Sequence, residues 1–238
     1  MKKIIALTLF DLKYVYRDFM LIVSIVAPLL LALLFRFAIP FISTFVEGRF
    51  SLNLLVYEEL FAIMLLLVVP VMQGLFAAFI ILDEQDEDIL TFLSVTPLSK
   101  KGYLLYRLGA PVLINTLLTF LALILAGYSH YITWALVPVI VLLALEAPLV
   151  ALFVAGIAKN KVEGLAVAKI ASILLLVPFL YYFVEGSWKY LGGVLPTFWT
   201  VAAFLERTTM DFWFFSGVSI LTHVLFLYIL FQNFKKTI

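Results

Sequence analysis

Residues 60–82 read LFAIMLLLVVPVMQGLFAAFIIL and contain no charged side chain. A helix rises 1.5 Å per residue, so about 20 apolar residues cross the roughly 30 Å hydrocarbon core of a bilayer, and this stretch is long enough. The rest of the chain has the same character, because 65% of its 238 residues are hydrophobic and only 13% are charged. A soluble domain has about 45–50% apolar and about 25% charged residues. The composition therefore excludes a water-soluble fold and predicts a polytopic membrane protein.

Five further windows are apolar over a membrane-spanning length. The six predicted crossings are residues 20–39, 60–82, 104–126, 134–158, 168–184 and 212–231. We expect an all-α fold, because each helix satisfies its own backbone hydrogen bonds within lipid. The first window is too long for a signal peptide and lacks a small-residue cleavage site, so we expect the segment before it to be retained. Residues 1–238 would then form a single transmembrane domain.

The distribution of Lys and Arg predicts the orientation of the crossings. With a cytoplasmic N-terminus, twelve of these residues lie in the cytoplasm and four lie outside. The cytoplasmic set is Lys2, Lys3, Lys13, Arg17, Lys100, Lys101, Arg107, Lys159, Lys161, Lys169, Lys235 and Lys236, and the outer set is Arg36, Arg49, Lys189 and Arg207. We expect both termini to be cytoplasmic and the protein to lie in the plasma membrane. The net charge of +1 gives no reason to expect a nucleic-acid partner.

Two segments outside the crossings have helical patterns. Residues 1–18 place apolar side chains on one side of a helical wheel and Lys and Arg on the other, which predicts an interfacial helix. It is either a lipid-surface anchor or a lever that joins a soluble partner to the first crossing, and the two readings are compatible. Residues 185–211 form the longest outer segment, and residues 194–205 within it are apolar but too few to cross. We expect an interfacial or shallow re-entrant helix that begins after Pro196.

The loop after the second crossing, residues 83–101, reads DEQDEDILTFLSVTPLSKK. Its five leading carboxylates suit the positive end of a helix dipole, and Pro97 ends any helix that precedes it. Ile89, Leu90, Phe92 and Leu93 fall on one face between these limits. The loop is thus predicted to contain a short amphipathic helix that docks a cytoplasmic partner. A well-solvated loop whose acids keep the second crossing from sliding is the alternative.

Several stretches of this chain resemble one transporter family. They are LDE at residues 82–84, TFLSVTPLS at 91–99, YLLYR at 103–107, NKVEGL at 160–165 and LPTFW at 195–199. The pattern is similar to that of ABC-2 type permeases and closest to the fluoroquinolone-exporter-like branch. One departure is that Glu87 and Asp88 stand where many ABC-2 permeases have a Gly before the coupling helix. That departure leaves open whether the local backbone and its partner fit the common form.

The resemblance implies a permease subunit that exports a hydrophobic or amphipathic drug, lipid or peptide by alternating access. A separate ABC ATPase subunit would bind MgATP, and a second permease copy, identical or paralogous, would complete the assembly. The chain itself has no Gly-x-x-x-x-Gly-Lys-Ser/Thr motif to bind ATP, so we expect neither an enzyme nor a cofactor in it. The implied ATPase-coupling interface is Glu84, Asp86, Asp88, Ile89, Leu90, Phe92, Leu93, Thr96, Pro97 and Leu98.

A few polar residues interrupt the crossings. Glu146 lies at the middle of the fourth one, where a charged side chain costs about 2.5–3.5 kcal/mol, so it should face the bundle, be protonated, or both. It is either a substrate or proton contact, or a neutral carboxyl that is hydrogen-bonded to a helix carbonyl beside Pro148. Gln73 and Asn115 are expected to hydrogen-bond between helices, and Arg36 to extend toward the outer interface.

Neither His130 nor His223 has a partner at metal-ligand spacing, and the chain has no cysteine, so no metal site is expected. Each histidine is expected to be a polar residue near its membrane interface. Two other transport functions stay open, a haem-exporter-type permease and a proton-coupled secondary transporter that uses Glu146. An intramembrane protease is disfavoured: Glu58 and Glu59 are adjacent, but Ile63 stands where such enzymes have an Arg.

Overall fold

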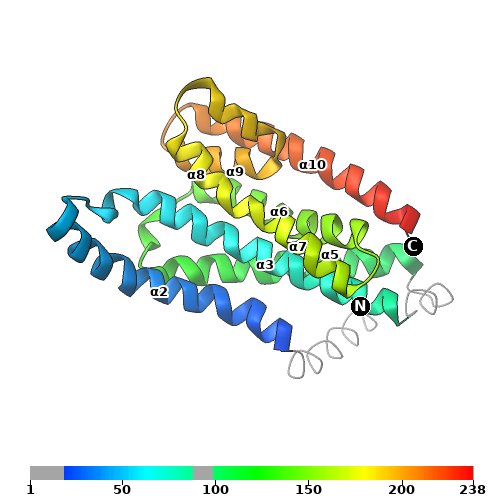
Figure 1. The fold of residues 1–238 in the computed structure, drawn as a ribbon. Coiled ribbons are helices and arrows are strands. Elements are labelled where there is room, and N and C mark those ends of the chain that lie inside the picture. Colours follow the sequence, from blue (N-terminus) through cyan, green and yellow to red (C-terminus); the bar gives the residue numbers. More distant parts are fainter. Residues whose placement is uncertain (1–18, 88–98, 238) are drawn as a thin grey trace.

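The computed structural model describes residues 19–87 and 99–237, and its helices run side by side as one bundle (Figure 1). The predicted helices within residues 1–18 and 89–93 lie outside the described residues. The α-helices are α2 (Phe19–Phe50), α3 (Glu58–Asp86), α5 (Ser99–Ala126), α6 (Leu136–Ile157), α7 (Lys161–Ala171), α8 (Val177–Phe183), α9 (Pro196–Leu205) and α10 (Asp211–Thr237). Short 3-10 helices are η1 (Leu54–Tyr57), η2 (Ser129–Tyr131), η3 (Ser172–Leu176) and η4 (Gly186–Val194).

Within the described residues, six helical segments are long and apolar enough to cross a membrane. They are Ile22–Phe50, Leu54–Asp86, Gly102–Ala126, Leu136–Ile157, Lys161–Phe183 and Asp211–Lys235. The prediction of an all-helical fold with six crossings is therefore confirmed. The protein is a multi-pass membrane protein.

The first crossing is longer than predicted. We placed its end at residue 39, whereas α2 continues through Pro40 to Phe50. The helix stops where Ser51 adopts a positive φ of 54° and the chain turns back. Ser43 stabilises this turn, because its hydroxyl donates to Asn53 Oδ1 at 3.2 Å and accepts from the Leu54 backbone N–H at 3.0 Å. As a consequence, Arg36 lies in the middle of α2 rather than near its outer end.

The fifth crossing begins earlier than predicted and consists of three pieces. Asn160 caps the start of α7, since its Oδ1 accepts a 2.9 Å hydrogen bond from the Glu163 backbone N–H, so the helix starts at Lys161 rather than residue 168. The α-helical pattern then tightens into η3 just before Pro178. Proline has no N–H to donate to the preceding turn, which favours a local change of helix type at this point.

Helix α9 is buried within the bundle although it is too short to cross it. Pro196 begins the helix, and most of its side chains are buried, Phe198 and Phe204 completely. It packs against α10, α8 and α6. Gly192 allows this packing, because a Cβ there would lie 2.6 Å from Leu180 Cδ2 and 2.7 Å from a ring carbon of Phe198. The predicted short helix after Pro196 is thus present, and it is enclosed by its neighbours.

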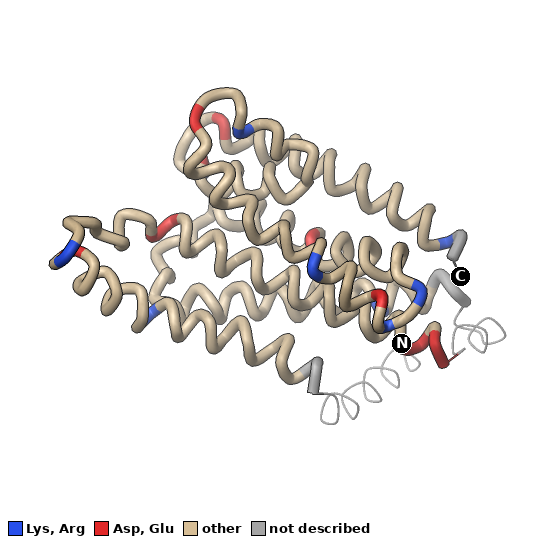
Figure 2. Tube along the Cα trace, viewed as in Figure 1, with Lys and Arg blue, Asp and Glu red and all other residues tan. Residues whose placement is uncertain are grey.

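The first described residues of α2 and the last of α10 lie at the same end of the bundle, together with the end of α3 and the start of α5 (Figure 1). Figure 2 shows that charged residues gather at the two ends of the helices, while the middle is almost entirely uncharged. An even number of crossings agrees with this arrangement. The cytoplasmic position of both termini stays a prediction.

Candidate functional site

A polar cluster lies in the interior of the bundle, centred on Glu146 in the middle of α6. The Glu146 side chain is completely buried. Its Oε1 accepts a hydrogen bond from the Thr197 hydroxyl of α9. Its Oε2 lies 2.6 Å from Nε2 of His223 on α10, which is also completely buried. One carboxyl group therefore joins three helices.

Two further hydroxyl groups extend this cluster. His223 Nδ1 lies 2.8 Å from the Ser219 carbonyl oxygen and 3.3 Å from the Ser219 hydroxyl. That hydroxyl lies 3.0 Å from the Thr200 hydroxyl of α9. We call Glu146, Thr197, Thr200, Ser219 and His223 the Glu146 cluster. None of the five side chains is exposed.

The sequence builds the cluster through helical spacing. Ser219 and His223 are four residues apart on α10, and Thr197 and Thr200 are three apart on α9, so each pair shares one face of its helix. Those two faces meet because α9 packs along α10. Polar groups in an apolar interior are stable only when they bond to one another, which makes the cluster a specific connection between α6, α9 and α10.

The sequence predicted Glu146 but did not predict its partner. The expectation of a lone histidine near the membrane interface is wrong for His223, which is completely buried and bonded to a residue 77 positions away in the chain. The four-residue spacing of Ser219 and His223 in an otherwise apolar helix was the available signal. It indicated a polar face on α10 but not which helix lies opposite. Contact of Glu146 with a substrate or proton stays a prediction.

The other predicted intramembrane residues lie apart from this cluster. Gln73 Nε2 donates to the Ser24 carbonyl oxygen of α2 at 2.8 Å, and Asn115 Nδ2 donates to the Leu143 carbonyl oxygen of α6 at 2.9 Å. Both are the interhelical hydrogen bonds expected of such residues. Arg36 is exposed, and its Nη1 lies 3.4 Å from the Leu125 carbonyl oxygen. Whether any of the three contacts a substrate stays a prediction.

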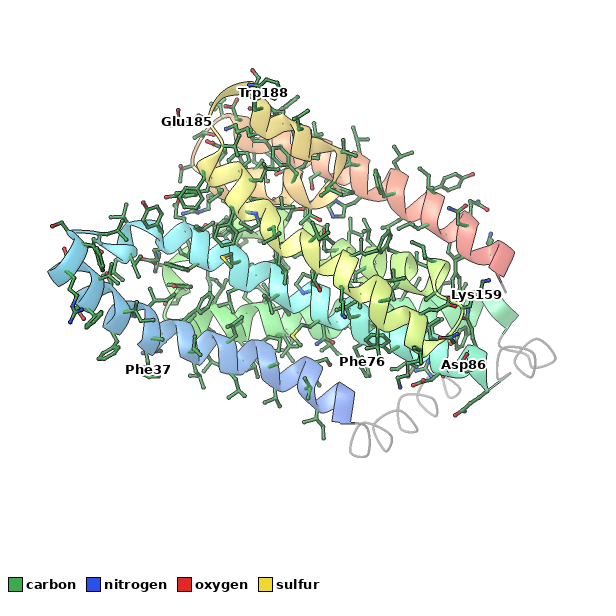
Figure 3. All side chains as sticks on the ribbon, in the orientation of Figure 1. Phe37, Phe76, Asp86, Lys159, Glu185 and Trp188 are labelled. Atoms are coloured by element: carbon green, nitrogen blue, oxygen red, sulfur yellow. The ribbon has the colours of Figure 1, made fainter. Side chains whose placement is uncertain are left out.

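At the predicted cytoplasmic end, acids at the end of α3 pair with bases of α5 and α7. Both carboxylate oxygens of Glu84 accept hydrogen bonds from Arg107, and Tyr103 donates to the same carboxylate. Lys161 Nζ lies 2.6 Å from Asp83 Oδ2, and the Lys161 backbone N–H donates to Asp86 at 3.3 Å. We call these six residues the ion-paired end. Figure 3 labels Asp86 and Lys159 at this end of the bundle.

The ion-paired end includes two members of the predicted ATPase-coupling interface, Glu84 and Asp86. The other members are Asp88, Ile89, Leu90, Phe92, Leu93, Thr96, Pro97 and Leu98, and they lie outside the described residues. The two described carboxylates lie at the end of α3, just before this loop, and both bond to groups of their own chain. Their predicted part in contacting an ATPase stays a prediction.

At the opposite end of the bundle, where Figure 3 labels Glu185 and Trp188, the paired glutamates are also bonded. Glu59 lies 2.6 Å from Nη2 of Arg207, and Glu58 lies 2.9 Å from Nε2 of His130. Burial, and secondarily the Glu58 carboxylate, raise the pKa of Tyr128 to about 12, so its hydroxyl remains protonated at neutral pH. Both glutamates are engaged in pairs that link helix ends.

Within residues 19–87 and 99–237, no group of three or more His, Cys, Asp or Glu side chains is placed to hold a metal ion.

Comparison with known proteins gives a consistent result over nearly the whole chain. A family model described as fluoroquinolones export permease protein Rv2686c-like matches residues 11–231. Two proteins of Mycobacterium tuberculosis, fluoroquinolones export permease proteins Rv2686c (strain H37Rv) and MT2760 (strain CDC 1551), are each 27% identical to the chain over 206 residues. These alignments cover 85% of this chain and 82% of each relative. No solved structure matches the chain. With six apolar crossings and a family match that extends from before the first of them into the sixth, the chain belongs to the Rv2686c-like family of export permeases.

Proposed function

We propose that this chain is the permease subunit of an ATP-driven exporter in the plasma membrane, with both termini in the cytoplasm. A separate ATPase subunit binds MgATP, and two permease copies, identical or paralogous, form the transport path. The observation that carries the proposal is the match to a family of export permeases across residues 11–231, which includes five crossings and most of the sixth.

The proposed substrate is an amphipathic aromatic drug. The curated relatives are named for export of fluoroquinolones, which are planar aromatic compounds with charged substituents. At 27% identity the relatives support a class of substrate rather than one compound. Apolar and aromatic side chains dominate the helices of this chain, and they suit a flat, largely hydrophobic molecule.

The ion-paired end supplies a physical route from an ATPase to the crossings. The Glu84–Arg107 pair connects the end of α3 to α5 on either side of the loop that contains the predicted coupling helix, and Lys161–Asp83 connects α3 to α7. A partner that moves this loop would therefore move three helices together. We infer that ATP binding draws two ATPase subunits together, which displaces the loop and the N-terminal helix and rocks the two permease copies from inward-open to outward-open.

The test is reconstitution of the permease with its ATPase in proteoliposomes. We expect a fluoroquinolone to stimulate vanadate-sensitive ATP hydrolysis and to be moved across the membrane only when ATP is present. Replacing Phe92 and Leu93 by Asp should uncouple hydrolysis from transport, because it removes the predicted apolar anchors. Val162→Asp is the control for an added carboxylate at the same end, since Val162 is an exposed residue of α7.

Three outcomes would contradict the proposal. If transport remains coupled to hydrolysis after both substitutions, the predicted coupling helix does not transmit ATP hydrolysis to the crossings. Stimulation by haem but not by fluoroquinolones would favour the haem-exporter alternative. Drug movement by the permease alone, driven by a proton gradient, would favour a proton-coupled secondary transporter.

A further inference from the structure

The hydrogen-bond donors and acceptors of the Glu146 cluster fix the position of one proton. His223 Nδ1 lies 2.8 Å from the Ser219 carbonyl oxygen, and a carbonyl oxygen only accepts, so Nδ1 carries a hydrogen. His223 Nε2 lies 2.6 Å from Glu146 Oε2, which is a hydrogen-bond distance. That contact needs one proton, held either by the carboxyl oxygen or by the imidazole nitrogen. In both cases the pair as a whole is neutral.

Other charged groups are remote from this pair. Helices α6 and α9 contain no further ionisable side chain. On α10, Asp211 and Lys235 are each twelve residues from His223, about 18 Å along the helix, and Tyr228 is exposed. The remaining described ionisable groups on packed elements are paired elsewhere or lie toward helix ends: Glu58, Glu59, Asp83, Glu84, Asp86, Tyr103, Tyr106, Arg107, Lys161, Glu163, Lys169, Tyr181, Tyr182, Lys189 and Tyr190.

We propose that Glu146 and His223 form a proton-binding site inside the bundle, and that the bound proton holds α9 and α10 against α6. Loss of the proton to water leaves a carboxylate facing an imidazole lone pair. Gain of a second proton places an O–H either at Oε2, where it faces the His223 N–H, or at Oε1, where it faces the Thr197 hydroxyl that donates to this oxygen. Either change replaces a donor–acceptor contact by two like groups in an apolar interior, so α10 and the helix α9 that packs along it separate from α6.

This site goes beyond the proposed export function and does not depend on it. The proton acts as a bound ligand that sets when three helices separate, whatever supplies the energy for transport. Both tests below use the purified full-length permease without an ATPase or a drug. Their failure would leave the export function intact, and failure of the export function would leave them interpretable.

The first test observes the proton through the imidazole nitrogens. The chain contains two histidines, so His130→Gln leaves His223 as the single signal in protein labelled with ¹⁵N-histidine. We expect a protonated Nδ1 and a strongly hydrogen-bonded Nε2 at neutral pH. Adding Glu146→Gln should remove the imidazolium form of His223 at neutral pH or leave a weaker hydrogen bond at Nε2. A neutral ring with a bare Nδ1 and a proton on Nε2 would overturn the proposal.

The second test observes the helix contact. The chain has no cysteine, so Ala203→Cys places a single thiol on the completely buried face of α9. We expect slow reaction with a water-soluble thiol reagent near neutral pH and several-fold faster reaction at both acidic and alkaline pH, within the range in which the helical circular dichroism is unchanged. A plot of the thiol reaction rate against pH then has a minimum near neutral pH, with one limb that rises toward acidic pH and one that rises toward alkaline pH.

Glu146→Gln distinguishes the proton from the side chain that holds it. The amide N–H of Gln donates to the bare Nε2 and cannot be lost, so the alkaline limb should disappear while the acidic limb remains. Thr119→Val is the control, because Thr119 is completely buried and its hydroxyl has no hydrogen-bond partner. It should keep both limbs. A flat profile in the parent protein, or two unchanged limbs in Glu146→Gln, would refute the proposal.

Discussion

The interior and the predicted cytoplasmic end of this bundle use similar pairs of groups in different surroundings. In the Glu146 cluster, a carboxyl and an imidazole are both completely buried. At the ion-paired end, the Glu84 and Arg107 side chains are each 14% exposed, and Lys161 and Asp83 are 38% and 40% exposed. Similar pairs of groups are therefore found in this bundle at exposures from completely buried to well exposed. The loss of stability on removing one partner should be largest for the completely buried pair and smallest for the most exposed one.

The physical reason is the fate of the group left behind. When one partner of an exposed pair is removed, water solvates the other, and the change in stability is small. When one partner of a completely buried pair is removed, the other group stays in an apolar interior without a hydrogen bond. The comparison predicts a ranking of substitutions by the stability that each one removes, and the three experiments below test that ranking.

The largest effect is expected for Glu146→Ala. It leaves His223 and the Thr197 hydroxyl buried without their shared hydrogen-bond partner, and we expect the free energy of unfolding in detergent to fall by about 3–5 kcal/mol. Denaturant titration followed by circular dichroism measures this. The double variant Glu146→Leu with His223→Leu should be less destabilised than Glu146→Ala, since it leaves neither group unpaired. A loss below about 1 kcal/mol for Glu146→Ala would place the pair in the class of exposed contacts.

An intermediate effect is expected for Glu84→Ala. This change removes the acceptor of the Arg107 and Tyr103 hydrogen bonds in a region that is mostly shielded, and bonds to charged groups contribute about 1.5–3 kcal/mol. The same denaturant titration applies. Asp83→Asn is the matched control at the neighbouring position, and its more exposed pair should lose about 1 kcal/mol or less. Equal losses for the two variants would mean that exposure does not rank these pairs.

The smallest of the three effects is expected for Gly74→Ala, which tests the packing that connects the two regions. Helix α3 carries Glu84, helix α6 carries Glu146, and a Cβ on Gly74 would lie 2.5 Å from the Ala147 carbonyl oxygen and 2.7 Å from Val150 Cβ. The helices must move apart, which we expect to lower the unfolding free energy by about 1–3 kcal/mol. Gly109→Ala, with no atom within 4 Å of its added Cβ, should be neutral or stabilising. If the two variants behave alike, α3 and α6 are not closely packed at Gly74.

Much of the architecture was predictable because the hydrophobic signal is local. The six crossings and the short helix after Pro196 were each predicted from apolar residues within one window. The errors arose where a local rule has two outcomes. The predicted window of the first crossing ends at residue 39, but the helix continues through Pro40, because proline in a long helix is tolerated when neighbouring groups satisfy the freed carbonyl. Likewise the predicted crossings leave residues 159–167 as a loop, whereas the Asn160 side chain caps α7, which begins at Lys161.

The sequence was sufficient to identify the polar residue Glu146 as a candidate, but it did not identify the residue that bonds to it. Glu146 was identified because a carboxyl in an apolar window is costly wherever the helix lies. The sequence contains nothing that says the group opposite it is His223, since that contact joins positions 77 residues apart. Glu84 was expected to face a partner protein, and the fold brings Arg107 and Tyr103 of α5 to it.

By itself, the amino-acid sequence determined that this chain is a helical membrane protein with six crossings, and it carried the resemblance that the family match supports. These properties follow from transfer of side chains between water and lipid, which depends on composition over about 20 residues at a time. Only the tertiary structure decided that α9 is enclosed by α6, α8 and α10, that a carboxyl, an imidazole and three hydroxyls meet inside the bundle, and that the acids of α3 pair with α5 and α7. Such contacts depend on which helix faces lie together, and helix packing sets that through the shapes of whole surfaces.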